Sequence, residues 1–298
     1  MLKLMKKELP LHLMVWPALV IVLIYSYGPM LGIVIAFQKY VPAMGFFKSK
    51  WVGWDNFEYL LHLPNIWQVV GNTIYISAMK IIAGLIVPIV VALLLNEVRI
   101  HAFKRSVQTL VYLPHFLSWV ILGGIVVDLL SPSTGLVNQL ISWFGGKPIF
   151  FVSNNHWFPF ILVSTDIWKE FGFSTIVYLA ALTSINPALY EAAVMDGANR
   201  MRQTWHITLP GLLPVIILMA TLSLGNVLNA GFDQVFNLYS PVVYQSGDIL
   251  DTLVYRLGLI DYQYSVATAV GLLKSIVSLI FMAGSYVLAY RFANYRIF

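Results

Sequence analysis

The chain alternates between long apolar stretches and short polar segments, and this pattern predicts six membrane-spanning helices. The apolar stretches cover residues 13–37, 66–95, 107–130, 157–183, 211–235 and 264–290. Each is near or above the roughly 20 residues that an α-helix needs to cross a bilayer. The segments between them are too short to fold as separate domains. We therefore expect one transmembrane domain over residues 1–298, all-α in class and built as a polytopic membrane helix bundle.

The first apolar stretch follows a basic tail, residues 1–12, and could be mistaken for a secretory signal peptide. It is too long for that role, and no small-residue cleavage site follows it. We interpret it as a retained first span.

The distribution of lysine and arginine predicts the orientation in the membrane, because cytoplasmic loops carry an excess of both. With both termini inside, ten basic residues fall in cytoplasmic segments: Lys3, Lys6, Lys7, Arg99, Lys104, Arg105, Arg200, Arg202, Arg291 and Arg296. Five fall in outer segments: Lys39, Lys48, Lys50, Lys147 and Arg256. This bias predicts cytoplasmic N and C termini, and it places the polar segment 185–210 in the cytoplasm.

Composition excludes an ordinary soluble domain and several kinds of chemistry. Hydrophobic residues make up 59% of the chain and charged residues 10%, and the mean hydropathy is +0.79. The sequence contains no cysteine, no H-E-x-x-H pattern and no P-loop, so it offers no thiolate metal site and no P-loop ATP hydrolysis. The net charge of +5 follows from membrane topology and does not indicate a nucleic-acid partner.

The polar segment 185–210 carries the pattern of a short helix that projects from the membrane. Asn186 suits a helix N-cap and Pro187 suits the first helical turn, where proline has no N–H to lose. Gly197 can bend the chain where a side chain would obstruct. Arg200 then opens a second, basic segment, which we expect Pro210 to close before the next span. The alternative is an ordinary amphipathic surface loop.

The same segment resembles the EAA loop of ABC-importer permeases. The pattern E-A-A-x-x-x-G, then nine residues, then I-x-L-P, is intact here. In that family the loop is where an ATPase subunit drives the membrane subunit. The resemblance implies that the coupling residues are Glu191, Ala192, Ala193, Asp196, Gly197, Ile207, Leu209 and Pro210.

The likeness extends over most of the chain. Residues 27–40 and 51–61, with a G-x-x-N-F element, look like the start of sugar permeases, although Trp54 stands where leucine is more usual. Residues 112–141 and 251–277 resemble the permeases that import oligosaccharides released from polysaccharides, the lipoprotein-type polysaccharide permeases. This implies the fold of a type I ABC importer transmembrane domain in a bacterial plasma membrane.

The resemblance also implies the partners. Such a subunit is non-catalytic and works with a second homologous permease, two ABC ATPase subunits and an extracytoplasmic solute-binding lipoprotein. ATP and magnesium would be bound by the partner ATPase, with no cofactor in this chain. The sequence does not specify the oligosaccharide.

Polar residues inside predicted spans are candidates for the substrate pathway, because they are costly in a membrane. Asp166 and Glu170 lie four apart in the fourth span, with Trp168 between them. Asn226, Asn229 and Asp233 are spaced to form one stripe on a fifth-span helix. Carboxylates, amides and an aromatic face suit a sugar, so we expect Asp166, Trp168, Asn226, Asn229 and Asp233 to line the pathway. The alternative is hydrogen bonding that only holds the bundle together.

Three lysines, Lys80, Lys169 and Lys274, also fall within predicted spans. We expect them to pair with those acids or to snorkel, with attraction of an anionic sugar as the alternative. His115 and His206 are expected to be structural.

Three other functions compete with an oligosaccharide ABC permease. An ABC permease for a non-carbohydrate solute would share the EAA loop but should lack the 251–277 pattern. An ion-coupled secondary transporter would work alone and has no use for the loop. An intramembrane enzyme would need a metal cluster or a nucleophile–base pair, which the sequence does not provide.

Overall fold

The computed structural model describes residues 2–293, and almost all of their regular structure is helical. Arg296 lies outside the described residues, as do Met1 and the side chains of Lys3, Lys6 and Lys7. The chain divides into two compact units: Met1–Ile66 with Val254–Leu273, and Trp67–Leu253 with Lys274–Phe298. The single transmembrane domain expected from the sequence stays a prediction.

The first unit begins with a long helix, which leads into a small hairpin and a short helix. Helix α1 (Leu2–Val22) continues through a π-helical turn, Leu23–Tyr27, and a 3-10 helix, Gly28–Phe37. Strand β1 (Gln38–Lys39) then pairs antiparallel with β2 (Lys50–Trp51), with α2 (Gly45–Lys48) between them and α3 (Asp55–Leu61) after them.

The G-x-x-N-F element closes this hairpin. Gly53 adopts a φ of 63°, which glycine tolerates best. The Asn56 side chain donates to the carbonyls of Ala36 (2.8 Å) and Gln38 (3.0 Å), and Phe57 is buried in the core of the unit. The unusual Trp54 packs edge-on against Phe37, with ring centroids 5.4 Å apart, so it contributes to the packing of the unit.

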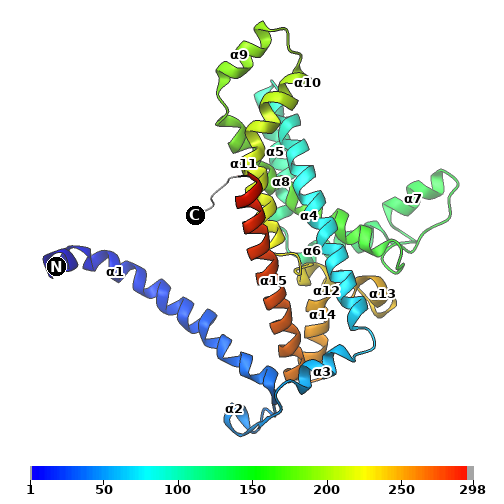
Figure 1. Ribbon diagram of the computed structural model, residues 1–298. Coiled ribbons are helices and arrows are strands. Elements are labelled where there is room, and N and C mark those ends of the chain that lie inside the picture. The colour runs from blue at the N-terminus through cyan, green and yellow to red at the C-terminus, as the bar shows by residue number, and fades with distance from the viewer. Residues whose placement is uncertain (1, 294–298) are drawn as a thin grey trace. The chain divides into compact units, whose positions relative to one another are not determined.

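The second unit is a helix bundle with α8 at its centre (Figure 1). Helix α8 packs against α5, α11, α12 and α13, and α12 also packs against α6. The helices from the end of the first unit onward are α4 (Ile66–Glu97), α5 (His101–Tyr112), α6 (Trp119–Leu129), α7 (Leu136–Trp143), α8 (Phe158–Thr183), α9 (Pro187–Met195), α10 (Arg200–Gln203), α11 (Leu209–Leu224), α12 (Phe232–Leu238), α13 (Tyr244–Gly247), α14 (Leu250–Tyr255) and α15 (Tyr264–Ala293).

Two apolar clusters form the core of this bundle. One contains Ile76 of α4 and Leu162 of α8, together with Ala230 and Val235 near the start of α12. The other contains Ala92 of α4, with Tyr178 of α8 and Leu212 of α11. On both α4 and α8, the residues between the two clusters include charged side chains, so a polar layer separates two apolar ones.

Helix length and hydropathy support six spans. Four described helices could cross a membrane unaided: His12–Phe37, Ile66–Glu97, Arg200–Leu224 and Tyr264–Val287. Two bent pairs add up to two more: His101–Phe116 with Trp119–Leu129, bent by 106°, and Phe158–Thr183 with Pro187–Met195, bent by 70°. The predicted helical membrane fold is therefore confirmed.

The third predicted span, residues 107–130, is not one continuous helix. Pro114 cannot donate a backbone hydrogen bond, and it lies in the 3-10 turn Leu113–Phe116 that ends α5. Ser118 is extended, and its hydroxyl accepts from the Ile121 N–H at 3.4 Å to cap α6. Between the fifth and sixth predicted spans, the chain also contains the short helices α13 and α14.

Candidate functional site

The polar segment 185–210 begins as a capped helix followed by a tight turn. The Asn186 side chain accepts a hydrogen bond from the Ala188 N–H at 3.0 Å, and Pro187 is the first residue of α9. Gly197 then turns the chain with a φ of 73°. Asn199 caps α10 by accepting from the Arg202 N–H at 2.9 Å. The predicted cap, first-turn proline and glycine bend are confirmed.

Helix α9 is exposed and carries apolar side chains that nothing in the described chain covers. Glu191 and Ala192 are exposed, and so are Leu189, Val194 and Met195, the last of them by 87%. Figure 1 shows α9 and α10 together at one end of the second unit. An exposed helix with small and apolar residues is a surface that a partner protein can approach closely.

The second part of the segment differs from expectation, because Pro210 does not close a helix. The chain is continuously helical from Arg200 to Leu224. A π-helical turn, Thr204–Thr208, widens the helix just before the proline, and the Leu209 N–H bonds to the Thr204 carbonyl. Such a turn accommodates a proline that would otherwise clash with the preceding turn. Ile207, Leu209 and Pro210 therefore belong to a rigid helix that enters the bundle.

Two contacts attach the segment 185–210 to the rest of the bundle. The Tyr190 hydroxyl lies 3.0 Å from the Thr208 hydroxyl and joins α9 to the continuous helix. Arg200 forms an ion pair with Glu97 at the end of α4. Beneath this pair, a hollow of about 340 Å³ separates the last turns of α4 from α10.

A buried lysine organises the polar layer in the middle of the second unit. The Lys80 ammonium of α4 lies 3.1 Å from the Asp166 carboxylate of α8. It also donates to the Ala230 carbonyl at 2.7 Å and to the Gln234 side-chain carbonyl. Only 8% of the Lys80 side chain is exposed, against 24% of Asp166. The expected pairing of Lys80 with an in-span acid is confirmed.

Gln234, which the sequence analysis did not single out, is the fully buried link of this layer. Its amide nitrogen donates to the Leu162 carbonyl and to the Thr165 hydroxyl, both at 2.7 Å, while its oxygen accepts from Lys80. It is the neighbour of Asp233, which is exposed. The sequence shows that these two polar residues are adjacent, but it does not show that Gln234 is buried and Asp233 is exposed.

The polar stripe predicted on the fifth span is wrong as a helical face. Helix α11 ends at Leu224. Residues 225–228 form turns and residues 229–231 have no regular structure; together they are called the turns 225–231 below. Helix α12 starts at Phe232 after Gly231, whose φ is 90°. Asn226 and Asn229 lie in the turns, and Asp233 lies in the first turn of α12. One tertiary hydrogen bond, from the Lys80 ammonium to the Ala230 carbonyl, fixes the end of this segment. All three side chains are nevertheless exposed.

The break in the third span is also tied to α8, one turn beyond Asp166. His115 Nδ1 lies 2.8 Å from Glu170 Oε2, and the His115 ring stacks on Phe173 with centroids 4.3 Å apart. The Lys169 ammonium donates to the His115 carbonyl and lies 3.6 Å from Glu170 Oε1. The contacts of His115 hold this turn in place, as a structural histidine would.

The three in-span lysines are therefore engaged with protein groups. Lys274 pairs with Asp251 rather than with the acids that the sequence suggested. Lys80 pairs with Asp166, and Lys169 with the His115 carbonyl and Glu170, so attraction of an anionic sugar stays an untested alternative. Within residues 2–293, no group of three or more histidine, aspartate or glutamate side chains is placed to hold a metal ion.

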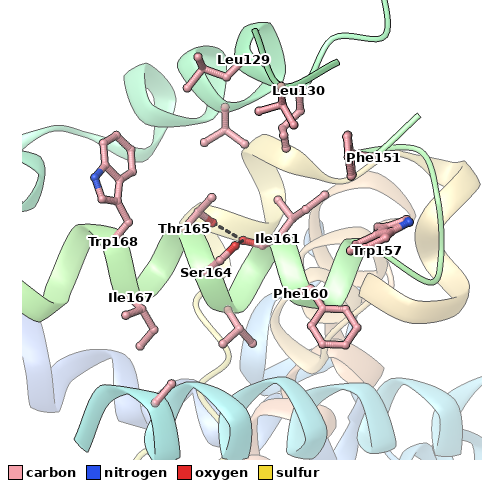
Figure 2. Close-up of a pocket in the computed structure, with 14 residues that line it drawn as sticks. Leu129, Leu130, Phe151, Trp157, Phe160, Ile161, Ser164, Thr165, Ile167 and Trp168 are labelled. Atoms are coloured by element: carbon pink, nitrogen blue, oxygen red, sulfur yellow. Dashed lines mark hydrogen bonds between the residues drawn. The ribbon is translucent and has the colours of Figure 1, made fainter. Parts of the chain in front are cut away.

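Trp168 faces a different environment from Asp166. It lines an apolar cavity of about 710 Å³ between α6 and α8, and Figure 2 shows it and Trp157 at opposite ends of the stretch of α8 that borders the cavity. The hydroxyls of Ser164 and Thr165 already bond to the Ile161 carbonyl. The lining therefore offers few of the polar partners that a sugar needs. A role for Trp168 or Asp166 in the pathway stays a prediction.

Comparison with known proteins identifies the chain's relatives. Residues 84–294 match the family described as binding-protein-dependent transport system inner membrane component. The polygalacturonan/rhamnogalacturonan transport system permease protein YteP of Bacillus subtilis (strain 168) is 45% identical over 288 residues, which cover 97% of this chain and 90% of that protein.

Solved structures give the same result. A chain in the crystal structure of a bacterial ABC transporter involved in the import of the acidic polysaccharide alginate has a TM-score of 0.90 and 40% identity, covering 97% of this chain and 98% of that one. A second alginate transporter structure, in complex with alginate pentasaccharide-bound periplasmic protein, has a TM-score of 0.89 at 40% identity and covers 97% and 96% of the two chains.

Proposed function

The chain belongs to the family of binding-protein-dependent transport system inner membrane components, and from that premise we propose that it is one permease subunit of an ATP-driven importer of oligosaccharides. The names of its relatives support this substrate class, since one is a polygalacturonan/rhamnogalacturonan permease and another belongs to an alginate importer. The substrate would be a fragment of such a polysaccharide, delivered by a solute-binding protein outside the membrane.

The observation that carries the proposal is the exposed helix α9 with its intact EAA pattern. Its exposed residues Glu191, Ala192, Asp196 and Gly197, together with the half-buried Ala193, would seat in a groove of an ABC ATPase subunit. Exposed Leu189, Val194 and Met195 would be covered in that complex. ATP and magnesium would be bound by the ATPase and not by this chain.

Force would travel from α9 into the membrane through one helix. The helix from Arg200 to Leu224 has 25 residues, which corresponds to roughly 37 Å at 1.5 Å per residue. Ile207, Leu209 and Pro210 lie within it, and the Tyr190–Thr208 contact fixes α9 to it. A displacement of α9 would therefore move the far end of this helix, where the turns 225–231 begin.

Those turns are the proposed substrate pathway. Non-helical backbone inside a membrane protein is tolerated where it is covered by protein or faces a water-filled cavity. Transporters place binding sites at such interrupted helices. Asn226, Asn229 and Asp233 are exposed at this interruption, so they are available to the hydroxyls of a sugar.

The complex would contain this chain and a second, homologous permease. One chain has one coupling segment and can engage one ATPase, while a motor of two ATPase subunits needs two such segments. The proposed orientation has N and C termini in the cytoplasm of a bacterial plasma membrane, which puts α9 on the side where ATP is found.

Co-purification from the native membrane tests this assignment. The expected complex contains this chain, a second permease and an ABC ATPase. Its ATP hydrolysis should rise when the cognate binding protein is loaded with a suitable oligosaccharide, for which fragments of polygalacturonan and alginate are the first candidates. A chain that purifies alone and transports in response to an ion gradient would instead be a secondary transporter.

A further inference from the structure

The Lys80 ammonium is saturated by acceptors from α8, from the interruption in the fifth span and from the helix that follows it. An ammonium has three N–H groups, and Lys80 meets three acceptors: Asp166 on α8, the Ala230 carbonyl and the Gln234 side chain. Ala230 comes just before Gly231, and Gln234 comes three residues after it. We propose that Lys80 is a positioning residue that holds the turns 225–231 in the shape needed for transport. This proposal rests on the pathway proposed above.

The position of Lys80 argues against a chance polar contact. It is the charged residue of an otherwise apolar stretch of α4, and the apolar clusters lie on either side of it. A buried ammonium is costly unless paired and hydrogen-bonded. A methionine would fill a similar space without that cost, but it could not donate to the Ala230 carbonyl.

The turn is shaped around the ammonium. Gly231 has a φ of 90°, and a Cβ at this residue would lie 3.1 Å from the Lys80 nitrogen. Glycine therefore provides both the left-handed backbone and the room for the charge. The side-chain nitrogen of Gln234 donates to two groups of α8, and these hydrogen bonds keep the side-chain oxygen next to Lys80.

The two residues that Lys80 holds are the sequence neighbours of the two proposed sugar contacts. Asn229 precedes Ala230, and Asp233 precedes Gln234. Ala230 and Gln234 are buried, whereas Asn229 and Asp233 are exposed. Fixing the buried pair thus sets the direction in which the exposed pair points. In this arrangement Lys80 acts on the sugar only through the backbone of the turn.

An experiment must separate positioning from simple stabilisation of the bundle. Lys80→Met alone leaves the half-buried Asp166 without its partner and can destabilise the fold. The double variant Lys80→Met/Asp166→Leu removes both charges, which is often neutral for stability, and still leaves Ala230 without its donor. Lys274→Met/Asp251→Leu is the matched control, because it removes another largely buried lysine–aspartate pair, 19% and 21% exposed, whose described partners do not include residues 225–231.

The readout is the position of the turn itself. The chain contains no cysteine, so Asn229→Cys introduces a single thiol. Its rate of labelling by a membrane-impermeant thiol reagent is measured in the assembled complex without sugar. In the Lys80→Met/Asp166→Leu background we expect this rate to change on the order of tenfold or more, as losing a hydrogen bond to a charged group implies. The control background should leave the rate unchanged.

An unchanged labelling rate in the Lys80→Met/Asp166→Leu complex would overturn the proposal, and so would an equal change in the control. The pathway proposal is tested separately by Asn229→Ala and Asp233→Ala. If these two variants keep normal sugar-stimulated ATP hydrolysis while the labelling rate still shifts, the pathway is wrong but Lys80 does position the turn.

Discussion

Gly197 offers the sharpest test of how α9 couples to an ATPase. Its φ of 73° is unfavourable for any residue with a Cβ, yet a Cβ there would meet no atom of this chain within 4 Å. Gly197→Ala therefore adds backbone strain and no clash. The cost of a left-handed alanine is about 1–2 kcal/mol, which corresponds to roughly a 5- to 30-fold shift toward another turn.

The segment between α7 and α8 provides a control with the same kind of strain. Gly145 has a φ of 78° and also has no atom within 4 Å of a Cβ. Gly145→Ala should carry the same backbone cost far from α9 along the chain. Both variants are assembled with the partner subunits, and ATP hydrolysis stimulated by the loaded binding protein is measured together with the amount of ATPase retained.

We expect Gly197→Ala to lower stimulated hydrolysis or ATPase retention several-fold while membrane insertion stays normal, and Gly145→Ala to leave both intact. Gly197→Asn should lose less than Gly197→Ala, because asparagine tolerates the left-handed conformation. Equal losses at Gly197 and Gly145 would mean general destabilisation, and no loss at either would refute the role of the turn in coupling.

Three further predictions follow from the site. Asn229→Ala and Asp233→Ala should impair sugar-stimulated ATP hydrolysis but not basal hydrolysis or assembly, because a bound sugar hydroxyl left without its hydrogen-bond partner costs about 1–3 kcal/mol. An unchanged dependence on loaded binding protein would make them structural. Gln234→Leu should lower the free energy of unfolding of the purified complex by about 1–3 kcal/mol, since it leaves one Lys80 donor unpaired, and an unshifted thermal melt would contradict this. Expression of this chain without a second permease should give no uptake, and an active complex that contains only copies of this chain would refute the heterodimer.

Local sequence rules predicted the backbone conformation of residues 186–197 well. Asn186, Pro187 and Gly197 each have a conformational preference that acts within a few residues, and the structure uses all three as expected. Pro210 shows the limit of such rules. A proline usually ends a helix, but here the π-helical turn before Pro210 lets the helix continue. The sequence Ile-Thr-Leu-Pro does not predict that turn.

The polar layer could not be derived from the sequence for a different reason. Lys80 and Gln234 are 154 residues apart, and their contact depends on how α4, α8 and α12 pack. Spacing alone placed Asn226, Asn229 and Asp233 on one helix, although Gly225 and Gly231 are the residues at which the structure interrupts it. Periodicity identifies which residues are polar in a span, but tertiary hydrogen bonds decide whether the span stays helical.

Uptake of labelled oligosaccharide into proteoliposomes tests the proposed function most directly. The vesicles contain the complete complex with ATP on the side of α9 and the loaded binding protein on the other side. We expect uptake that requires both ATP and binding protein and that falls sharply with Glu191→Ala, while assembly in the membrane is unaffected. Full uptake by the Glu191→Ala complex, or uptake that persists without ATP, would contradict the account.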